Sequence, residues 1–265
     1  MITFTVDLED PTERYEPDGR HVIMTRRILD MCKKMQRRAT FFIVGRVAAS
    51  APRLLQEIIA GGHEVAYHSH NHVPLTEEKP ARFRRESAED KDRFEQITGH
   101  AVWGFRAPRF SLTPQSLWAI DILGELGFRY SSSVMPTNIS LFGLPNAART
   151  PSIWPNGLIE LPLPVANIGP LRIPYLGGIY LYALPDFLTR YWVSKASPQE
   201  MLWTYTHPYD FDRENKFAPM PHTPRWVSLV LGASRYVAED KIRRILRGAN
   251  APPLAERVAK HIIKE

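Results

Sequence analysis

The sequence contains almost no cysteine and no long uninterrupted hydrophobic segment. Cys32 is the single cysteine in 265 residues, so an intrachain disulfide is excluded, and its place in a helical pattern predicts a buried, unreactive thiol. The longest apolar region, 158–188, is interrupted by five prolines, which exclude one continuous transmembrane helix. The first residues show neither the basic segment nor the apolar run of a signal peptide. We therefore expect a soluble, cytoplasmic protein.

The chain carries a formal net charge of +6, which favours anionic partners such as acidic glycans, sugar nucleotides, lipid headgroups or nucleic acid. The basic residues gather in 26–38 and 235–247. We interpret each stretch as the solvated face of an amphipathic helix, with an anion site as the alternative. No nucleic-acid-binding motif accompanies the charge, so we do not expect nucleic acid as a partner.

Short apolar runs alternate with amphipathic segments through the first half of the chain. This alternation is typical of parallel βαβ units. Residues 134–185 are rich in proline and glycine and are predicted to form an elaborated loop region. Strands are predicted at 2–6, 39–44, 63–67, 101–105, 127–130 and 201–206. Helices are predicted at 23–36, 52–61, 81–97, 114–125, 186–194 and from 226 onward, with breaks at 232 and 252–253.

Acidic residues follow the first predicted strand directly. Asp7, Glu9 and Asp10 stand where a buried strand ends, and the active sites of parallel barrels lie at that end of the strands. Acidic side chains are costly to bury unpaired, so this cluster needs a cation or hydrogen-bond donors. An ordinary helix cap and loop cluster is the alternative interpretation.

Three histidines follow the third predicted strand within five residues. A helical turn would place His68 and His72 on one face, as in metal-binding histidine pairs, and would direct His70 elsewhere. Two imidazoles, one carboxylate and a water are typical of a catalytic zinc site. The alternative is a solvated histidine-rich loop, and His21 and His63 are interpreted as structural.

Two further polar residues follow predicted strands. Arg106 comes after the fourth strand and is expected to pair with a carboxylate, holding it ionised, unless it forms a surface salt bridge. His207 comes after the last strand and is fixed by Pro208, which makes it a candidate general acid. A hydrogen-bonded loop histidine is the alternative.

Taken in order, these clusters resemble the NodB-homology polysaccharide deacetylases, the fourth carbohydrate esterase family, from Thr5 to Asp212. The resemblance extends to a branch found in bacterial exopolysaccharide and O-antigen gene clusters. The family motifs are matched by Thr5-Val-Asp7-Leu-Glu9-Asp10, by the segment from Gly62 to His72, by Phe105-Arg106-Ala-Pro108 and by Tyr205-Thr206-His207-Pro208. The branch is matched by Glu160-Leu-Pro162, by Gly177-Gly178 with Tyr180, and by 207–212.

The resemblance implies a role for each matching residue and a fold. Asp7 would be the general base, oriented by Arg106, and His207 the general acid. The metal would be held by Glu9, His68 and His72, and the substrate contacted by Arg109, Glu160 and Tyr180. The implied fold is α/β, an incomplete (β/α)₇ barrel with an elaborated loop region and C-terminal helices. We expect a single deacetylase domain over 1–265, with the catalytic barrel core in 1–212 and a C-terminal helical extension in 213–265.

The sequence departs from the family pattern after the fifth predicted strand. The common pattern supplies an aspartate there to tune the acid histidine, whereas this chain has Ser131 and two more serines. Asp210 or Asp212 is the expected replacement. The second acid of the first motif is Glu9 in place of the usual aspartate, which leaves Asp10 as an alternative ligand. The aromatic residues considered for stacking on sugar rings, with core packing as the alternative, are Trp154, Tyr175, Tyr180 and Tyr182.

The resemblance implies a metal-dependent hydrolase that deacetylates an N-acetylated sugar in bacterial surface polysaccharide biosynthesis. The implied cofactor is a divalent metal, Zn²⁺ ahead of Co, Ni, Mn or Fe, and the substrate is an N-acetylated glycan, a sugar nucleotide or a lipid-linked sugar. The alternatives are an allantoinase-like or other amide C–N hydrolase and a catalytically weak glycan-binding protein. A further hypothesis is peripheral contact with the inner face of the inner membrane. The basic residues of that contact would be Arg235, Lys241, Arg243, Arg244, Arg247, Arg257 and Lys260.

Overall fold

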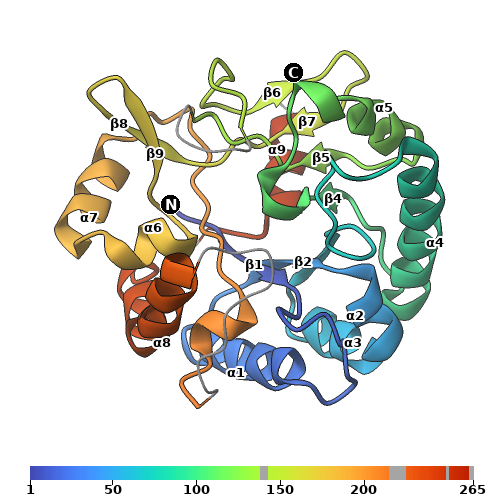
Figure 1. Cartoon of the computed structure of the whole chain (residues 1–265), viewed down its shortest axis with the longest axis horizontal. Helices are drawn as coiled ribbons and strands as arrows, with labels where there is room; N and C mark the ends of the chain where they lie inside the picture. Colours follow the sequence, from blue (N-terminus) through green and yellow to red (C-terminus); the bar gives the residue numbers. More distant parts are fainter. Residues whose placement is uncertain (138–142, 215–224, 249–250, 263–265) are drawn as a thin grey trace.

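The computed structural model of this chain describes residues 1–137, 143–214, 225–248 and 251–262 (Figure 1). Its strands are β1 (Phe4–Leu8), β2 (Ala39–Ile43), β3 (Glu64–Tyr67), β4 (Gly104–Phe105), β5 (Tyr130–Ser131), β6 (Ser152–Ile153), β7 (Ile159–Glu160), β8 (Val165–Ile168) and β9 (Leu171–Pro174). Its α-helices are α1 (Arg20–Lys34), α2 (Gly45–Ser50), α3 (Pro52–Ala60), α4 (Pro80–Thr98), α5 (Trp118–Glu125), α6 (Gly178–Ala183), α7 (Asp186–Lys195), α8 (Arg225–Ile245) and α9 (Leu254–Ile262). Three short 3-10 helices are η1 (Pro108–Phe110), η2 (Pro114–Ser116) and η3 (Pro208–Phe211).

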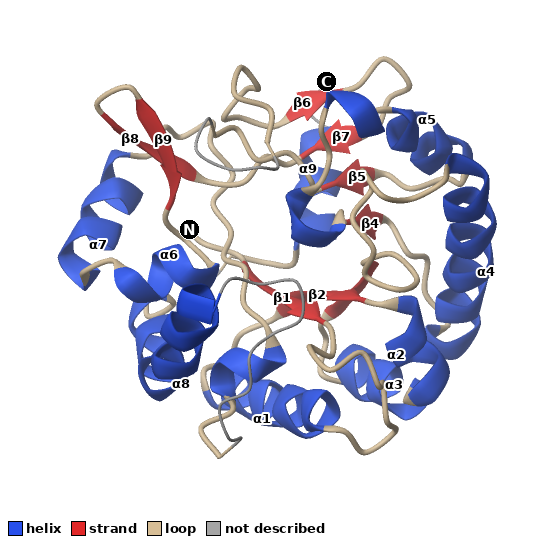
Figure 2. Ribbon diagram, viewed as in Figure 1, coloured by secondary structure: helices blue, strands red, loops and turns tan. Residues whose placement is uncertain are grey.

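A seven-stranded sheet organises the described part of the molecule, and β8 and β9 form a separate antiparallel pair. The strand order of the seven-stranded sheet is β1-β2-β3-β4-β5-β7-β6, and every neighbouring pair is parallel except β6 with β7. Helices α1 to α5 lie outside these strands, as expected for successive βαβ units (Figure 2). The predicted α/β class with a mostly parallel sheet is confirmed, and the seven-unit barrel form stays a prediction.

Burial explains why the first predicted elements form where the pattern placed them. Strands β1 and β2 are buried at every residue, as in sheets covered on both faces. Helix α1 buries Ile28, Met31 and Cys32 against the core, and Lys33 and Lys34 are exposed. Burial raises the pKa of the Cys32 thiol to about 12, which agrees with the predicted unreactive thiol.

The segment 201–206 was predicted as the last strand, and the structure contains only isolated pairings there. Thr3 pairs with Trp203 and Val6 with Thr206, both in parallel, so this segment lies on the free edge of β1. The predicted break at Gly232 is also wrong, because α8 runs continuously through that residue. Glycine inside a helix lowers its stability by about 1 kcal/mol relative to alanine, which need not end the helix.

The C-terminal residues close the end of the sheet opposite the carboxyl ends of its strands. Leu254 and Val258 of α9 are fully buried in a second apolar cluster with Phe42, Tyr130 and Trp203. Two backbone N–H groups at the start of α9 donate to side chains of the sheet, at 2.9 Å to Thr40 and at 3.0 Å to Glu64. Helix α9 of the predicted extension is therefore packed into the core; the boundary at 212 stays a prediction.

Candidate active site at the carboxyl ends of the strands

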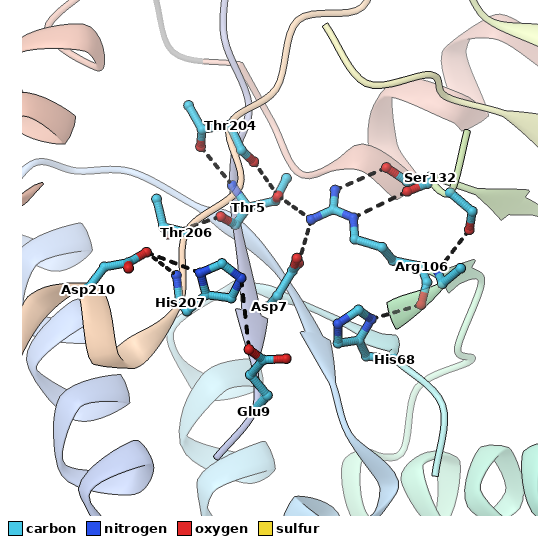
Figure 3. Close-up of polar contacts among 12 residues, drawn as sticks. Thr5, Asp7, Glu9, His68, Arg106, Ser132, Thr204, Thr206, His207 and Asp210 are labelled. Atoms are coloured by element: carbon cyan, nitrogen blue, oxygen red, sulfur yellow. Dashed lines mark hydrogen bonds and ion pairs between the residues drawn. The ribbon is translucent and has the colours of Figure 1, made fainter. Parts of the chain in front are cut away.

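Two acidic side chains lie at the carboxyl end of β1. Asp7 is near the end of β1 and Glu9 is the first residue after it, and both side chains lie near His207 in the close-up (Figure 3). Both are buried, with 3% and 8% of their surfaces exposed. The next acid, Asp10, accepts hydrogen bonds from Thr12 N at 2.9 Å and from Tyr15 N at 3.0 Å. Asp10 therefore shapes the following loop, and Glu9 is the acid that reaches the site.

The two histidines that follow β3 converge on Glu9. One ligand atom from each of Glu9, His68 and His72 lies within 4.8 Å of the others, and His72 Nε2 forms an ion pair with Glu9 Oε2. The expected helical turn is absent, because 68–72 is a bent loop. Ser69 and His72 have positive φ angles of 62° and 58°, and this bend brings the two imidazoles together.

Protonation states in this cluster suit a cation. His68 Nδ1 lies 2.8 Å from the carbonyl oxygen of Arg106; a carbonyl only accepts, so Nδ1 carries the hydrogen and Nε2 keeps its lone pair. Burial lowers the pKa of His68 to about 4, which keeps the ring neutral. Burial also opposes ionisation of Glu9, but the neighbouring histidines, His72 foremost, outweigh burial and lower the pKa of Glu9.

Arg106 holds Asp7 from the other side. Its guanidinium is fully buried and donates to Asp7 Oδ1 at 2.5 Å, to Thr5 Oγ1 at 2.8 Å and to Ser132 Oγ at 3.0 Å (Figure 3). It also lies over the ring of Phe42, 3.9 Å from the centroid. The interaction with Asp7 is therefore a buried ion pair, and the surface salt bridge considered from the sequence is excluded.

His207 approaches Glu9 because the segment before it pairs with β1. Its Nε2 lies 4.0 Å from Glu9 Oε1 and its Nδ1 lies 3.2 Å from Asp210 Oδ2 (Figure 3). Burial disfavours the imidazolium, but the carboxylate of Asp210 outweighs burial and raises the pKa of His207 to about 9. Tyr209 stacks on the imidazole with ring centroids 4.6 Å apart. The raised pKa keeps the ring protonated at neutral pH, the state in which an imidazole can donate a proton.

The replacement for the missing aspartate is Asp210. Its Oδ2 also accepts hydrogen bonds from His207 N and Tyr182 OH, each at 2.8 Å. Asp212 instead pairs with Arg20 of α1, whose Nε donates to it at 2.8 Å. The sequence could not distinguish Asp210 from Asp212, because the choice depends on η3, which turns only Asp210 toward the imidazole.

The predicted substrate contacts lie in different surroundings. Arg109 is exposed on η1 and has a positive φ of 55°. Tyr180 is half-buried on α6, near Tyr205, whose ring meets His207 edge-on. Glu160 is 2% exposed and accepts hydrogen bonds from Ser133 N at 2.7 Å and Val134 N at 2.9 Å. These hydrogen bonds fix the loop after β5, and the three substrate contacts stay predictions.

The aromatic residues considered for sugar stacking are mostly enclosed. Tyr175 and Tyr182 are 2% and 8% exposed, so neither offers a free ring face. Trp154 is partly exposed and its Nε1 lies 3.5 Å from Glu160 Oε2. Sequence reasoning gave no role to Thr5 and Tyr209, which stand within the matched motifs, or to Ser132, which stands in the serine run after the fifth predicted strand.

The fold and the site define the class of protein first: an α/β protein with a candidate divalent-metal site, flanked by a carboxylate and an imidazole, at the carboxyl ends of parallel strands. Residues 17–131 match the sequence model described as polysaccharide deacetylase, and 132–256 match a domain of unknown function, DUF3473. The first match confirms the predicted relationship to NodB-type polysaccharide deacetylases for residues 17–131, which are less than half of the chain. Asp7, Glu9 and His207 lie outside 17–131, so their place in the site rests on geometry.

Similar proteins agree with this relationship. A chitooligosaccharide deacetylase from Bradyrhizobium sp. (strain ANU 289) is 30% identical over 106 residues, which are 40% of this chain and 46% of the relative. The match thus covers less than half of that relative. A probable polysaccharide deacetylase from Pseudomonas aeruginosa PAO1 has a TM-score of 0.63 at 16% identity, covering 100% of this chain and 91% of the other. For one from Mycobacterium smegmatis the TM-score is 0.60 at 17% identity, with coverage of 98% and 88%. At these identities the two structures show the fold alone.

Proposed function

We propose that this protein is a metal-dependent hydrolase that removes the acetyl group from an N-acetylated sugar of a glycan. The observation that carries the proposal is the convergence of Glu9, His68 and His72 between two acid–base pairs, the buried Asp7 with Arg106 and the partly buried His207 with Asp210. Amide hydrolysis needs a proton acceptor for water and a proton donor for the departing amine, and these pairs supply one of each.

The three converging side chains fit a divalent cation, with Zn²⁺ as the first choice. Ligands about 2.1 Å from a tetrahedral zinc ion lie about 3.4 Å from each other, which is compatible with ligand atoms within 4.8 Å of one another. The buried Glu9 Oε2 faces Nε2 of His72, and a set of two imidazoles and one carboxylate is typical of catalytic zinc sites and leaves a coordination position open. When bound, the cation supplies Lewis acidity, which makes a water more acidic and polarises the amide carbonyl.

Asp7 would accept the proton of the attacking water. Arg106 holds one carboxylate oxygen by a charge-assisted hydrogen bond, so the orientation of the carboxylate is fixed before substrate arrives. Arg106 is itself fixed by Thr5 and Ser132, and this arrangement keeps the base in one rotamer.

His207 would donate the proton to the amine as the C–N bond breaks. An unprotonated amine anion is a very poor leaving group, so this step needs a protonated donor within reach. Asp210 favours the imidazolium and orients its ring. The serine at 131 motivated the alternative of a catalytically weak protein, and Asp210 removes that reason.

The proposed substrate class is an N-acetylated glycan in bacterial surface polysaccharide biosynthesis, with sugar nucleotides and lipid-linked sugars as carriers to be compared. The name of the Bradyrhizobium relative supports an N-acetylated oligosaccharide, and the motifs shared with the exopolysaccharide branch support the biosynthetic role. None of the helices in the described ranges combines the length and hydrophobicity needed to cross a bilayer.

Membrane contact through the C-terminal basic run finds little support, because most of these cations are used within the fold. Lys241 is 5% exposed and donates to the carbonyl of Leu184. Arg243 pairs with Glu239 and Arg244 with Asp186, and Arg257 donates to Thr3 Oγ1 and Leu202 O.

The test is acetate release from chito-oligosaccharides, nucleotide-linked and lipid-linked N-acetyl sugars, with Zn²⁺ present and after chelation. We expect release by the wild type that chelation abolishes, and loss of at least about 100-fold in Asp7→Asn, because general-base catalysis contributes about 10²- to 10⁴-fold. The matched control is Asp10→Asn, which changes a neighbouring acid outside the cluster. Full activity of Asp7→Asn would refute the base assignment, and hydrolysis of non-sugar amides alone would favour the other C–N hydrolase.

A further inference from the structure

The loop that carries both metal-binding histidines has a backbone that needs support. Ser69 and His72 have left-handed φ angles, which are unfavourable for residues with a side chain. A loop of this kind persists only where its surroundings fix it. The question is therefore what prevents 68–72 from relaxing and separating the two imidazoles.

Part of the support is backbone hydrogen bonding to the start of α2. Gly45 N donates to Ser69 O at 2.9 Å and Arg46 N donates to His70 O at 3.2 Å. Within the loop, His72 N donates to Ser69 Oγ at 3.1 Å. These contacts fix one side of the loop and leave the side chain of His70 to determine the other.

His70 is directed away from the metal-binding cluster, toward α4. Its Nδ1 lies 2.8 Å from Asp90 Oδ2, and Asp90 is completely buried. The carboxylate also accepts from Tyr67 OH at 3.2 Å and from Arg93 Nη1 at 2.5 Å. Burying a carboxylate costs free energy, which the three hydrogen-bond donors offset while fixing its position. One of these donors, His70, lies in the loop between His68 and His72.

Close packing makes this anchor rigid. A Cβ atom at Gly45 would lie 1.8 Å from Asp90 Oδ2, so only glycine lets α2 approach the carboxylate. The same glycine donates its N–H to the loop. Helix α2, the loop and α4 therefore meet at one point, and a change at Asp90 or His70 is transmitted to the loop backbone.

We propose that Asp90 is a positioning residue for the metal site: through His70 it clamps the loop 68–72 so that His68 and His72 converge on Glu9. This inference rests on the proposed function, because it concerns the loop that would hold the cation. It assigns to the His70–Asp90 pair a role in metal affinity, beyond joining α4 to the sheet. Loss of such supporting contacts typically weakens metal binding about 10- to 100-fold.

The experiment compares Zn²⁺ affinity in matched variants, measured by competition with a chromogenic chelator. His70→Leu replaces the imidazole by an apolar side chain of moderate size and so removes the hydrogen-bond donor to Asp90. His70→Asn keeps an N–H donor near the position of Nδ1. Tyr67→Phe is the control, because it removes a different hydrogen bond to Asp90 and leaves the loop bond intact. Asp90→Asn is the second test variant should His70→Leu fail to fold, and the unfolding temperature of each metal-free protein reports folding.

We expect the Kd for Zn²⁺ to rise about 10- to 100-fold in His70→Leu, with recovery in His70→Asn and little change in Tyr67→Phe. Wild-type affinity in a folded His70→Leu or Asp90→Asn would overturn the inference and leave the metal site standing. Equal losses of Zn²⁺ affinity in His70→Leu, His70→Asn and Tyr67→Phe would also overturn the inference. The loss would then be caused by disturbed packing around Asp90 and not by the missing hydrogen bond to the loop. A wild-type protein that binds no Zn²⁺ would overturn both the inference and the proposed function.

Discussion

His63 offers a quantitative test of how burial controls acid stability. The residue stands directly before β3 and is 6% exposed, with Nδ1 accepting the N–H of Ala39 at 3.0 Å. Its ring meets Phe41 edge-on at 5.4 Å. Burial, together with the positive charge of Arg38, lowers the pKa of His63 to about 4. The folded protein therefore keeps this imidazole neutral well below the pH at which a free histidine becomes charged.

The sign of the effect follows from proton binding. The unfolded chain takes up this proton near pH 6.5 and the folded protein only near its lowered pKa, so the unfolded state binds more protons in between. The stabilisation is complete above the unfolded pKa and is lost as the pH falls toward the folded one. The contribution of His63 to the free energy of unfolding is on the order of 3 kcal/mol in total. Of this, about 2 kcal/mol is lost between about pH 7 and about pH 5.

The perturbation is His63→Asn, whose amide oxygen can accept the Ala39 N–H but does not titrate. Urea unfolding followed by tryptophan fluorescence would give the free energy of unfolding of both proteins at each pH. We expect the wild type to lose about 2 kcal/mol more than the variant on acidification. Other acid-sensitive groups, such as the buried Glu64, contribute to both proteins and cancel. Equal losses in the two proteins would refute the reasoning.

Two further predictions concern the acid and the C-terminal helix. Asp210→Asn should lower kcat about 10- to 100-fold with Zn²⁺ affinity unchanged, because His207 loses the partner that orients it; Asp212→Asn is the matched control, and equal activity of the two variants would contradict the assignment. Leu254→Ala should lower the free energy of unfolding by about 2–5 kcal/mol, because its side chain is fully buried beneath the sheet. Thermal or urea unfolding measures this loss, and a loss typical of a surface residue would show that α9 is not part of the core.

Much of the candidate site was predictable from the sequence because its chemistry is tied to local position. Alternating short apolar runs and amphipathic segments imply parallel strands, and polar residues directly after those strands must then gather at one edge. Asp7, Glu9 and Arg106 were predicted in this way, and the structure brings them together with the histidines. The helical premise for the pair of histidines was wrong, yet the pair converges, because a bent loop can achieve the same proximity.

Other features depend on contacts between residues far apart in the chain. The choice of Asp210 over Asp212 depends on how η3 packs between α1 and β1. The clamp at Asp90 needs α4 to lie beside the loop after β3. Neither contact has a period or a motif in the sequence, so no local pattern predicts it.

The sequence by itself determined the order of the elements, the residue types at the strand ends and hence the kind of chemistry available. The tertiary structure decided that Asp210 faces His207 and that Asp10 accepts hydrogen bonds from the loop after Glu9. It also decided that α9 packs against the end of the sheet opposite the site. The physical reason is the distance along the chain over which each property is determined. Hydrophobic periodicity and side-chain chemistry are properties of neighbouring residues, whereas the direction of a side chain is fixed by packing and hydrogen bonds that distant segments supply.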